Sequence, residues 1–292
     1  MSIRSSYIAA LLILAGFFSS CNRTADYEII DIDSGINIKM VEIFDESPRR
    51  LELHCATMRS YPNLCYGLNG EHRLSSNSID ITFKNIIRRK GMCLDAIGTA
   101  DARINLGAIS SGTFSLNLTL HGETYRGELI VSSESYQINF NDNSDFQFSN
   151  NPLRKIPENT IWGRIGYNDT EGLTFANTFI IALLGLGAIE QKFVHGNYGE
   201  FEIGENGQIV QPINYNDYEY IDGILFDKNG NTVLPINVNN TGRAFVQSFI
   251  LYFSGNFTDV EQLARQYVRD YGDYLSIRLF SDKGEKYFGF RE

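Results

Sequence analysis

The sequence has few of the residues that most catalytic and cofactor motifs require. It contains 4 histidines, 4 cysteines and 1 tryptophan in 292 residues. The histidines form no metalloprotease pair and follow no Gly-x-Ser-x-Gly motif. Gly185 and Gly187 lie inside an apolar run with no third glycine at the spacing of a dinucleotide fingerprint. We therefore expect no cofactor and no metal site, and a non-catalytic protein is favoured over an enzyme.

Positive charge is also in deficit. The chain has 25 Lys and Arg against 35 Asp and Glu, a formal net charge of −10. An acidic surface repels nucleic-acid phosphates, so nucleic acid is not an expected partner. The basic run 88–90 is interpreted as a solvated loop tip. Carboxylates are so numerous that no glycosidase pair can be singled out, and the oxygen-rich stretches 141–145 and 227–231 are interpreted as solvated turns rather than calcium loops.

A hydrophobic run near the N-terminus ends on a cysteine. Residues 8–18 are almost entirely apolar and lead through two serines to Cys21. Small residues before such a cysteine are typical of a secretory signal whose thiol receives a diacylglyceryl group, here with Phe18 in place of the usual leucine. We expect residues 1–21 to be a lipoprotein signal peptide with its lipobox, and Cys21 to carry acyl chains such as palmitate that bind a membrane. The alternative is an ordinary signal peptide with Cys21 unmodified.

The other three cysteines would then lie in an oxidising compartment. Cys55 alternates with Leu51 and Leu53, which predicts a buried side chain on a strand. Cys65 and Cys93 each follow a turn signal, so we expect these two to form the one internal disulfide.

Residues 27–140 alternate apolar and polar side chains with a period of two. Turn residues separate the segments, which predicts an antiparallel β-sandwich without helices. The strands are expected at 36–43, 50–57, 78–86, 113–120, 123–131 and 136–140.

One stretch in this region carries a resemblance. Residues 106–118 read Leu-Gly-Ala-Ile-Ser-Ser-Gly-Thr-Phe-Ser-Leu-Asn-Leu, similar to the penultimate strands of bacterial immunoglobulin-like domains, which often run Leu-x-x-Gly-Thr-Tyr-x-Leu-x-Ile. With Cys93-Leu94 and Gly98-Thr99-Ala100 upstream, the region resembles N-terminal sandwich domains of bacteroidete-type lipoproteins of unknown function. The resemblance implies an immunoglobulin-like domain over 27–140 and no active-site residues.

Asn, Asp, Ser and two prolines in 141–159 indicate a linker, and an α+β domain is expected over 160–292. The apolar stretch 174–189 is shorter than a membrane span of about 20 residues, so it predicts a buried helix with Thr174 as its N-cap. A second helix is expected from a capping box of Thr258 and Glu261 up to Gly272, between a strand and a hairpin.

Aromatic residues in this second region suggest a ligand surface. Tyr215, Tyr218 and Tyr220 alternate with Asn, Asp and Glu, and Trp162 and Tyr198 lie elsewhere in the region. Rings stack on the apolar faces of sugars while carboxylates and amides bind hydroxyls. The alternative interpretation is that the alternating tyrosines only mark a strand.

Together these features predict a lipid-anchored protein of the cell envelope, in the outer membrane of a Gram-negative bacterium, that binds a glycan or protein ligand or acts in adhesion. An envelope hydrolase acting on glycans or peptides and a structural envelope lipoprotein are the alternatives. Acids clustered in a concave pocket with raised pKa values would favour the hydrolase, and an aromatic surface patch would favour binding.

Overall fold

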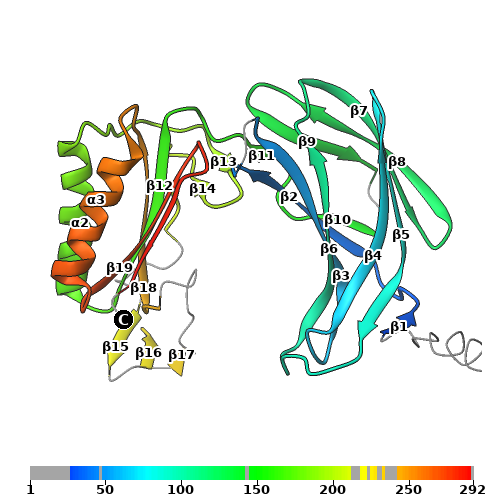
Figure 1. Cartoon of the computed structure of the whole chain (residues 1–292), viewed down its shortest axis with the longest axis horizontal. Helices are drawn as coiled ribbons and strands as arrows, with labels where there is room; N and C mark the ends of the chain where they lie inside the picture. The colour runs from blue at the N-terminus through cyan, green and yellow to red at the C-terminus, as the bar shows by residue number, and fades with distance from the viewer. Residues whose placement is uncertain are drawn as a thin grey trace, which may run out of the picture.

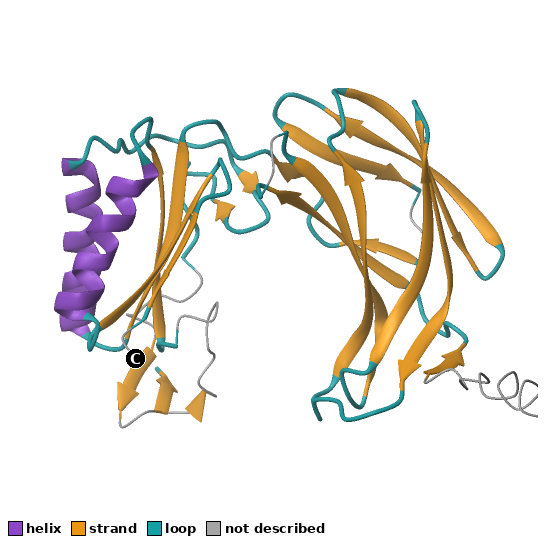
Figure 2. Cartoon of the chain, in the orientation of Figure 1, coloured by secondary structure: helices purple, strands orange, loops and turns teal. Residues whose placement is uncertain are grey.

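The computed structural model of the chain is mainly β (Figures 1 and 2). It describes residues 27–45, 48–141, 145–211, 218–221, 224–228, 232–233 and 242–290. A large curled sheet forms the N-terminal part, and a smaller sheet that carries two helices follows it. The predicted fold class, a β-sandwich followed by an α+β region, is therefore confirmed.

The large sheet contains most of the strands. Its strands in chain order are β1 (Tyr27–Ile30), β2 (Ile36–Ile43), β3 (Arg50–Tyr61), β4 (Tyr66–Leu74), β5 (Ser78–Arg89), β6 (Gly98–Gly107), β7 (Gly112–Leu120), β8 (Glu123–Val131), β9 (Ser135–Phe140), β10 (Phe146–Phe148), β11 (Leu153–Arg154), β13 (Gly196–Asn197) and β14 (Glu202–Ile203). Their hydrogen-bonded order is β10-β2-β3-β6-β4-β5-β7-β8-β9-β11-β13-β14, and β1 pairs with β5.

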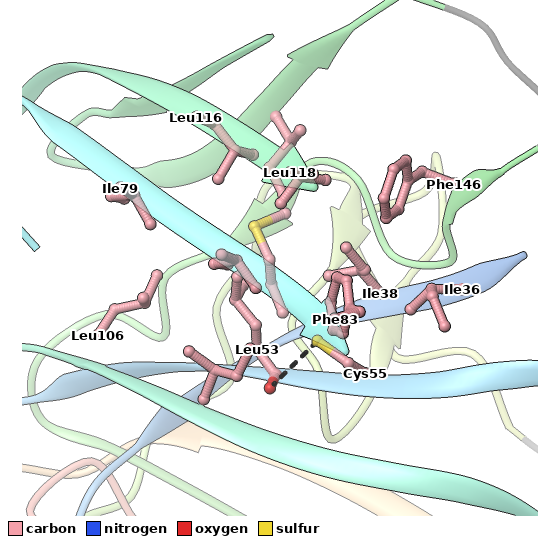
Figure 3. Packing of buried hydrophobic residues seen from close by; sticks show 14 of the residues in the cluster. Ile36, Ile38, Leu53, Cys55, Ile79, Phe83, Leu106, Leu116, Leu118 and Phe146 are labelled. Atoms are coloured by element: carbon pink, nitrogen blue, oxygen red, sulfur yellow. Dashed lines mark hydrogen bonds between the residues drawn. The ribbon is translucent and has the colours of Figure 1, made fainter. Parts of the chain in front are cut away.

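The two halves of this sheet pack face to face. Alternate residues of β2, such as Ile36 and Ile38, meet Leu116 and Leu118 of β7 in one buried cluster (Figure 3). All four side chains are at most 1% exposed. Since burial of apolar surface is the main favourable term in folding, this contact between halves holds the sandwich together.

The connection between the halves differs from that of an immunoglobulin domain, which has two separate sheets. Here the sheet is continuous, but the halves are joined through a single parallel pair, Gly67 of β4 opposite Asp101 of β6. Strands β5 and β7 pair in parallel, as do β10 and β2. The two packed layers are those of a β-sandwich, whereas the strand pairing, with its three parallel pairs, differs from that of an immunoglobulin domain.

The stretch 141–159, expected to be a linker, extends this sheet through two asparagines. The Asn150 side chain accepts from the Met40 N–H at 2.8 Å and donates to the Met40 carbonyl at 2.6 Å. Asn151 binds the N–H and carbonyl of Ile138 in the same way, at 2.9 and 2.6 Å. Each amide thus satisfies both backbone groups of a neighbouring strand residue, so polar residues that indicated a loop serve as sheet partners.

The smaller sheet has the order β18-β12-β19-β20 and is antiparallel throughout. Its elements are β12 (Thr160–Tyr167), α2 (Thr170–Gly185), β18 (Phe245–Tyr252), α3 (Phe257–Tyr271), β19 (Leu275–Ser281) and β20 (Lys286–Gly289). Both helices lie on one face of the sheet (Figure 2). Ile165 of β12, Phe179 of α2 and Val260 of α3 are fully buried between these layers.

Both helices begin earlier than predicted. The cap of α2 is Asp169, whose side chain accepts from the Gly172 N–H at 2.7 Å, and not Thr174. The cap of α3 is Asn256, whose side chain accepts from the Thr258 N–H at 3.0 Å. Thr258, predicted as the cap, therefore lies in the first turn. In each case an earlier Asp or Asn satisfies a free N–H of the first turn.

A third sheet is formed by β15 (Tyr218–Ile221), β16 (Ile224–Asp227) and β17 (Thr232–Val233), paired in sequence and antiparallel. Of the predicted turn 227–231, Asp227 ends β16 and residues 229–231 lie outside the described residues. Within the part of the chain that the structure describes, no helix is both long and apolar enough to cross a membrane.

Candidate functional site

A cleft of about 890 Å³ lies where the large sheet meets the second region. It is bounded by the end of β2, the loop before β3, the start of β9 and the segment after β11, and residues such as Val194 and Tyr198 close it from the second region. Its size is within the range of small-molecule and oligosaccharide sites, about 300–1,000 Å³.

The cleft is built around a carboxylate that breaks the pattern of its strand. Glu42 occupies the buried face of β2, in phase with Ile36, Ile38 and Met40, and is 8% exposed. An apolar residue is expected at such a position, because a buried charge is costly unless it is paired.

Three neighbouring groups compensate the Glu42 carboxylate. One oxygen accepts from the Ile156 N–H at 3.2 Å. The other accepts from the Tyr136 hydroxyl at 3.4 Å and lies 3.8 Å from the Arg49 guanidinium. Burial raises the pKa of the Glu42 carboxyl above its ordinary 4.5, and Arg49 offsets part of that rise. The effect of desolvation on the Glu42 pKa is therefore larger than the combined opposite effect of its hydrogen-bond and charge partners.

Arg49 connects the two sheets. Its guanidinium donates to the Ile156 carbonyl and to the Asp282 carboxylate, the latter at 3.0 Å, and stacks over the Phe44 ring at 5.1 Å. Asp282 follows β19 and accepts from the Thr160 N–H at 3.2 Å. A chain of charged and polar contacts thus runs from Glu42 in the first sheet to the start of β12 in the second.

Lys155 and Tyr136 form the adjacent wall. The Lys155 ammonium donates to the Ser132 carbonyl at 2.7 Å and lies 4.5 Å from the centre of the Tyr136 ring. Burial lowers the pKa of Lys155, whereas burial and the nearby Glu42 raise the pKa of the Tyr136 hydroxyl. Both shifts have the same cause, since burial penalises each charged form.

The rim of the cleft carries more weakly bound groups. Arg154 lies 3.7 Å from Glu134, whose side chain is 74% exposed. The Arg154 Nε is buried and has no hydrogen-bond partner among the described residues. Glu158, Ser110 and Ser133 add polar groups to the lining, and Ile109 adds an apolar surface. Unlike Glu42 and Arg49, these rim groups have donors and acceptors available to a ligand.

The predicted aromatic ligand surface is wrong for two of its residues. Trp162 and Tyr198 are brought together in one cluster, but they are only 5% and 4% exposed. The ring centres of Trp162 and Tyr198 lie 6.1 and 5.2 Å from that of Phe201. The Trp162 ring also lies 5.5 Å, centre to centre, from that of Phe44, which directly follows β2. These rings fill the junction between the sheets. Tyr198 also lines the cleft, but with only 4% of its surface exposed it offers a ligand little ring area.

The other tyrosines of that prediction remain untested. Tyr218 and Tyr220 lie in β15, where only the backbone is described, and Tyr215 lies outside the described residues. Cys21 and residues 229–231 of the oxygen-rich stretch 227–231 are also outside them.

The cysteines lie away from the cleft. Cys65 and Cys93 form a disulfide with their Cα atoms 5.6 Å apart, the pairing that the sequence predicts. Cys55 is 1% exposed in the sandwich core, and burial raises the pKa of its thiol to about 12 (Figure 3). A thiol with so high a pKa is not a nucleophile at neutral pH. Among the described residues no group of three or more His, Cys, Asp or Glu side chains could hold a metal ion.

Sequence reasoning missed Glu42, Arg49, Lys155 and Asp282. One signal was available, because Glu42 falls in phase with the apolar face of a strand whose bounds the alternation predicts. The others are brought to Glu42 only by the tertiary fold. Comparisons with protein-family models, with curated proteins and with solved structures find no match for this chain. Its function is therefore argued from its own residues.

Proposed function

We propose that the chain is a non-catalytic, lipid-anchored protein of the cell envelope that binds a glycan in the cleft between its two sheets. The anchor is the lipid on Cys21, inferred from the apolar run and the serines before it. The observation that carries the binding role is the cleft itself, whose inner charged groups are fixed by each other and whose rim groups are accessible.

The chemistry of the rim suits a polyhydroxylated ligand. Arg154 and Ser110 can donate hydrogen bonds, while Glu134 and Glu158 can accept them, and sugar hydroxyls do both. Ile109 and Val194 offer apolar surface to the C–H faces of a sugar ring. Cationic and anionic groups are balanced along the lining, which favours a neutral glycan over a strongly charged one.

A printed array of bacterial, plant and animal oligosaccharides tests this proposal, followed by calorimetric titration of the best oligosaccharide. Arg154→Ala is expected to weaken binding by about tenfold, since a charge-assisted hydrogen bond contributes about 1.5–3 kcal/mol. Lys84→Ala is the matched control, because Lys84 of β5 pairs with Glu71 of β4 and lines none of the cleft. No array binding, or equal losses in both variants, would contradict a glycan site in this cleft.

One observation favours a second candidate, an envelope glycan hydrolase. The general acid of a glycan hydrolase is usually a carboxylic acid that lies in a concave site and has a raised pKa. Glu42 has that property, although its oxygens are occupied by Arg49, Ile156 and Tyr136. Mass spectrometry of each bound oligosaccharide after prolonged incubation separates the candidates. Intact sugar supports binding alone, whereas cleavage that Glu42→Gln abolishes would replace the binding role with hydrolysis.

A further inference from the structure

Four large apolar side chains project from one end of the sandwich. Leu64, Met92, Leu94 and Ile97 are 50%, 107%, 75% and 80% exposed. We refer to these four residues as the apolar tip. Large apolar groups gathered in this way on a soluble surface mark a site of contact with another apolar body.

The apolar tip is a built feature of the fold. Leu64 and Leu94 come from separate segments, and the Leu64 N–H donates to the Leu94 carbonyl at 3.2 Å. The disulfide joins the adjacent residues Cys65 and Cys93, so it holds both segments together. Gly98 leaves space for Leu64, since a Cβ there would lie 2.4 Å from a Leu64 methyl carbon. The segments that carry Leu64 and Leu94 are therefore held side by side.

Basic side chains adjoin the apolar tip. Arg88 and Arg89 end β5, Lys90 follows it, and all three are exposed and precede Met92. Two carboxylates lie in the same hollow: Glu28, which is 3.3 Å from Arg88, and Asp95. The surface beside the apolar tip, with three cations and two carboxylates, is thus slightly cationic, in a chain whose formal net charge is −10. Cations beside exposed apolar groups match an anionic lipid surface, where side chains enter the interface and bases meet headgroups.

The lipid anchor begins next to this surface. Strand β1 pairs with the end of β5, and Tyr27 lies opposite Arg89. Cys21 precedes Tyr27 by six residues, which can span at most about 20 Å. Figure 1 shows β1 and helix α2 at opposite ends of the molecule. A lipid on Cys21 would therefore keep the apolar tip at the bilayer while α2 points away from it.

We propose that the apolar tip inserts into the surface of the membrane that holds the anchor, with Arg88, Arg89 and Lys90 against its anionic headgroups. This contact fixes the orientation of the sandwich and directs the second region outward. The inference rests on the proposed lipid anchor and is independent of the ligand in the cleft.

Fluorescence quenching by brominated lipid tests the insertion directly. The full lipidated chain carrying Leu94→Trp is reconstituted into vesicles of phosphatidylethanolamine and phosphatidylglycerol that contain bromine-labelled acyl chains. The matched control is Ile181→Trp, a 65% exposed residue on α2 at the far end of the molecule. Native Trp162 is buried in both variants and supplies a constant background.

The bromine-labelled lipid is expected to quench the fluorescence of the tryptophan introduced at position 94 and not that of the tryptophan introduced at position 181. Vesicle flotation confirms that both variants are attached to the membrane. Adding Met92→Ser and Ile97→Ser is expected to restore most of the emission, because the apolar contact is removed. Flotation without quenching at position 94 would overturn the tip insertion and leave the anchor standing. A blue shift there without quenching would mean that a second copy of the chain covers the tip. Failure to float would overturn both the anchor and the insertion.

Discussion

Arg49→Ala tests the link between the two sheets. The substitution removes the hydrogen bonds to Asp282 and to the Ile156 carbonyl and takes the nearest cation from Glu42. Only 7% of the Asp282 side chain and 3% of the Glu42 side chain are exposed, so water cannot replace the guanidinium. Breaking a buried pair costs about 3–5 kcal/mol. The Arg49 side chain is 25% exposed and Glu42 can take up a proton, so we expect about 3 kcal/mol, the lower end of that range.

Urea unfolding of the full chain at pH 7 measures this loss. Trp162 reports it, because its ring contacts Phe44, over which Arg49 stacks. Arg59→Ala is the control: its partner is Asp33, and the two side chains are 57% and 48% exposed, so the loss is expected to be at most about 1 kcal/mol. If the two variants lose equal stability, the contacts of Arg49 do not hold the junction between the sheets.

Three further experiments have expected outcomes. Because the pKa of Glu42 is raised in the folded state, the fold binds its proton more tightly, and stability falls as pH rises from 4.5 through the raised pKa. Glu42→Gln should remove this part of the decrease in unfolding free energy, measured by urea titrations at a series of pH values. An unchanged slope of unfolding free energy against pH would contradict this expectation. Replacing Cys65 and Cys93 by Ser should cost about 3.5 kcal/mol of stability from loop entropy, measured by thermal unfolding; a loss below about 1 kcal/mol would contradict the constraint. Asn256→Ala should cost about 1 kcal/mol and Thr258→Ala much less, and the reverse order would restore the predicted capping box.

Alternation predicted the strands that have one buried and one exposed face. The predicted bounds of β2 and β8 agree with the structure, although Glu42 in β2 and the run Leu129-Ile130-Val131 in β8 interrupt the alternation. Strands β4 and β6 were missed. β4 reads Tyr-Gly-Leu-Asn-Gly-Glu-His-Arg-Leu, is half exposed and has no regular apolar face. In β6, Ala100, Ala102, Ile104 and Leu106 do alternate toward the core, but two of these four are small alanines, so the apolar signal is weak. These strands are fixed by their partners rather than by their own residues.

The cleft could not be predicted from the sequence because its residues meet only through tertiary contacts. Glu42 and Asp282 are separated by most of the chain, and Arg49 joins them. The aromatic prediction failed for a related reason. Trp162 and Tyr198 combine apolar rings with polar groups, which suits a ligand surface and a buried junction equally well. Their burial between the sheets decides for the junction.

Mass spectrometry of the mature N-terminus tests the lipid anchor, on which the envelope location and the tip insertion both depend. The protein is extracted from membranes with detergent and cleaved with trypsin. Residues 1–20 are expected to be absent, and the first peptide, Cys21 to Arg23, is expected to carry the mass of a diacylglyceryl group and an amide-linked acyl chain. A mature chain that begins elsewhere, or a Cys21 peptide of unmodified mass, would contradict it.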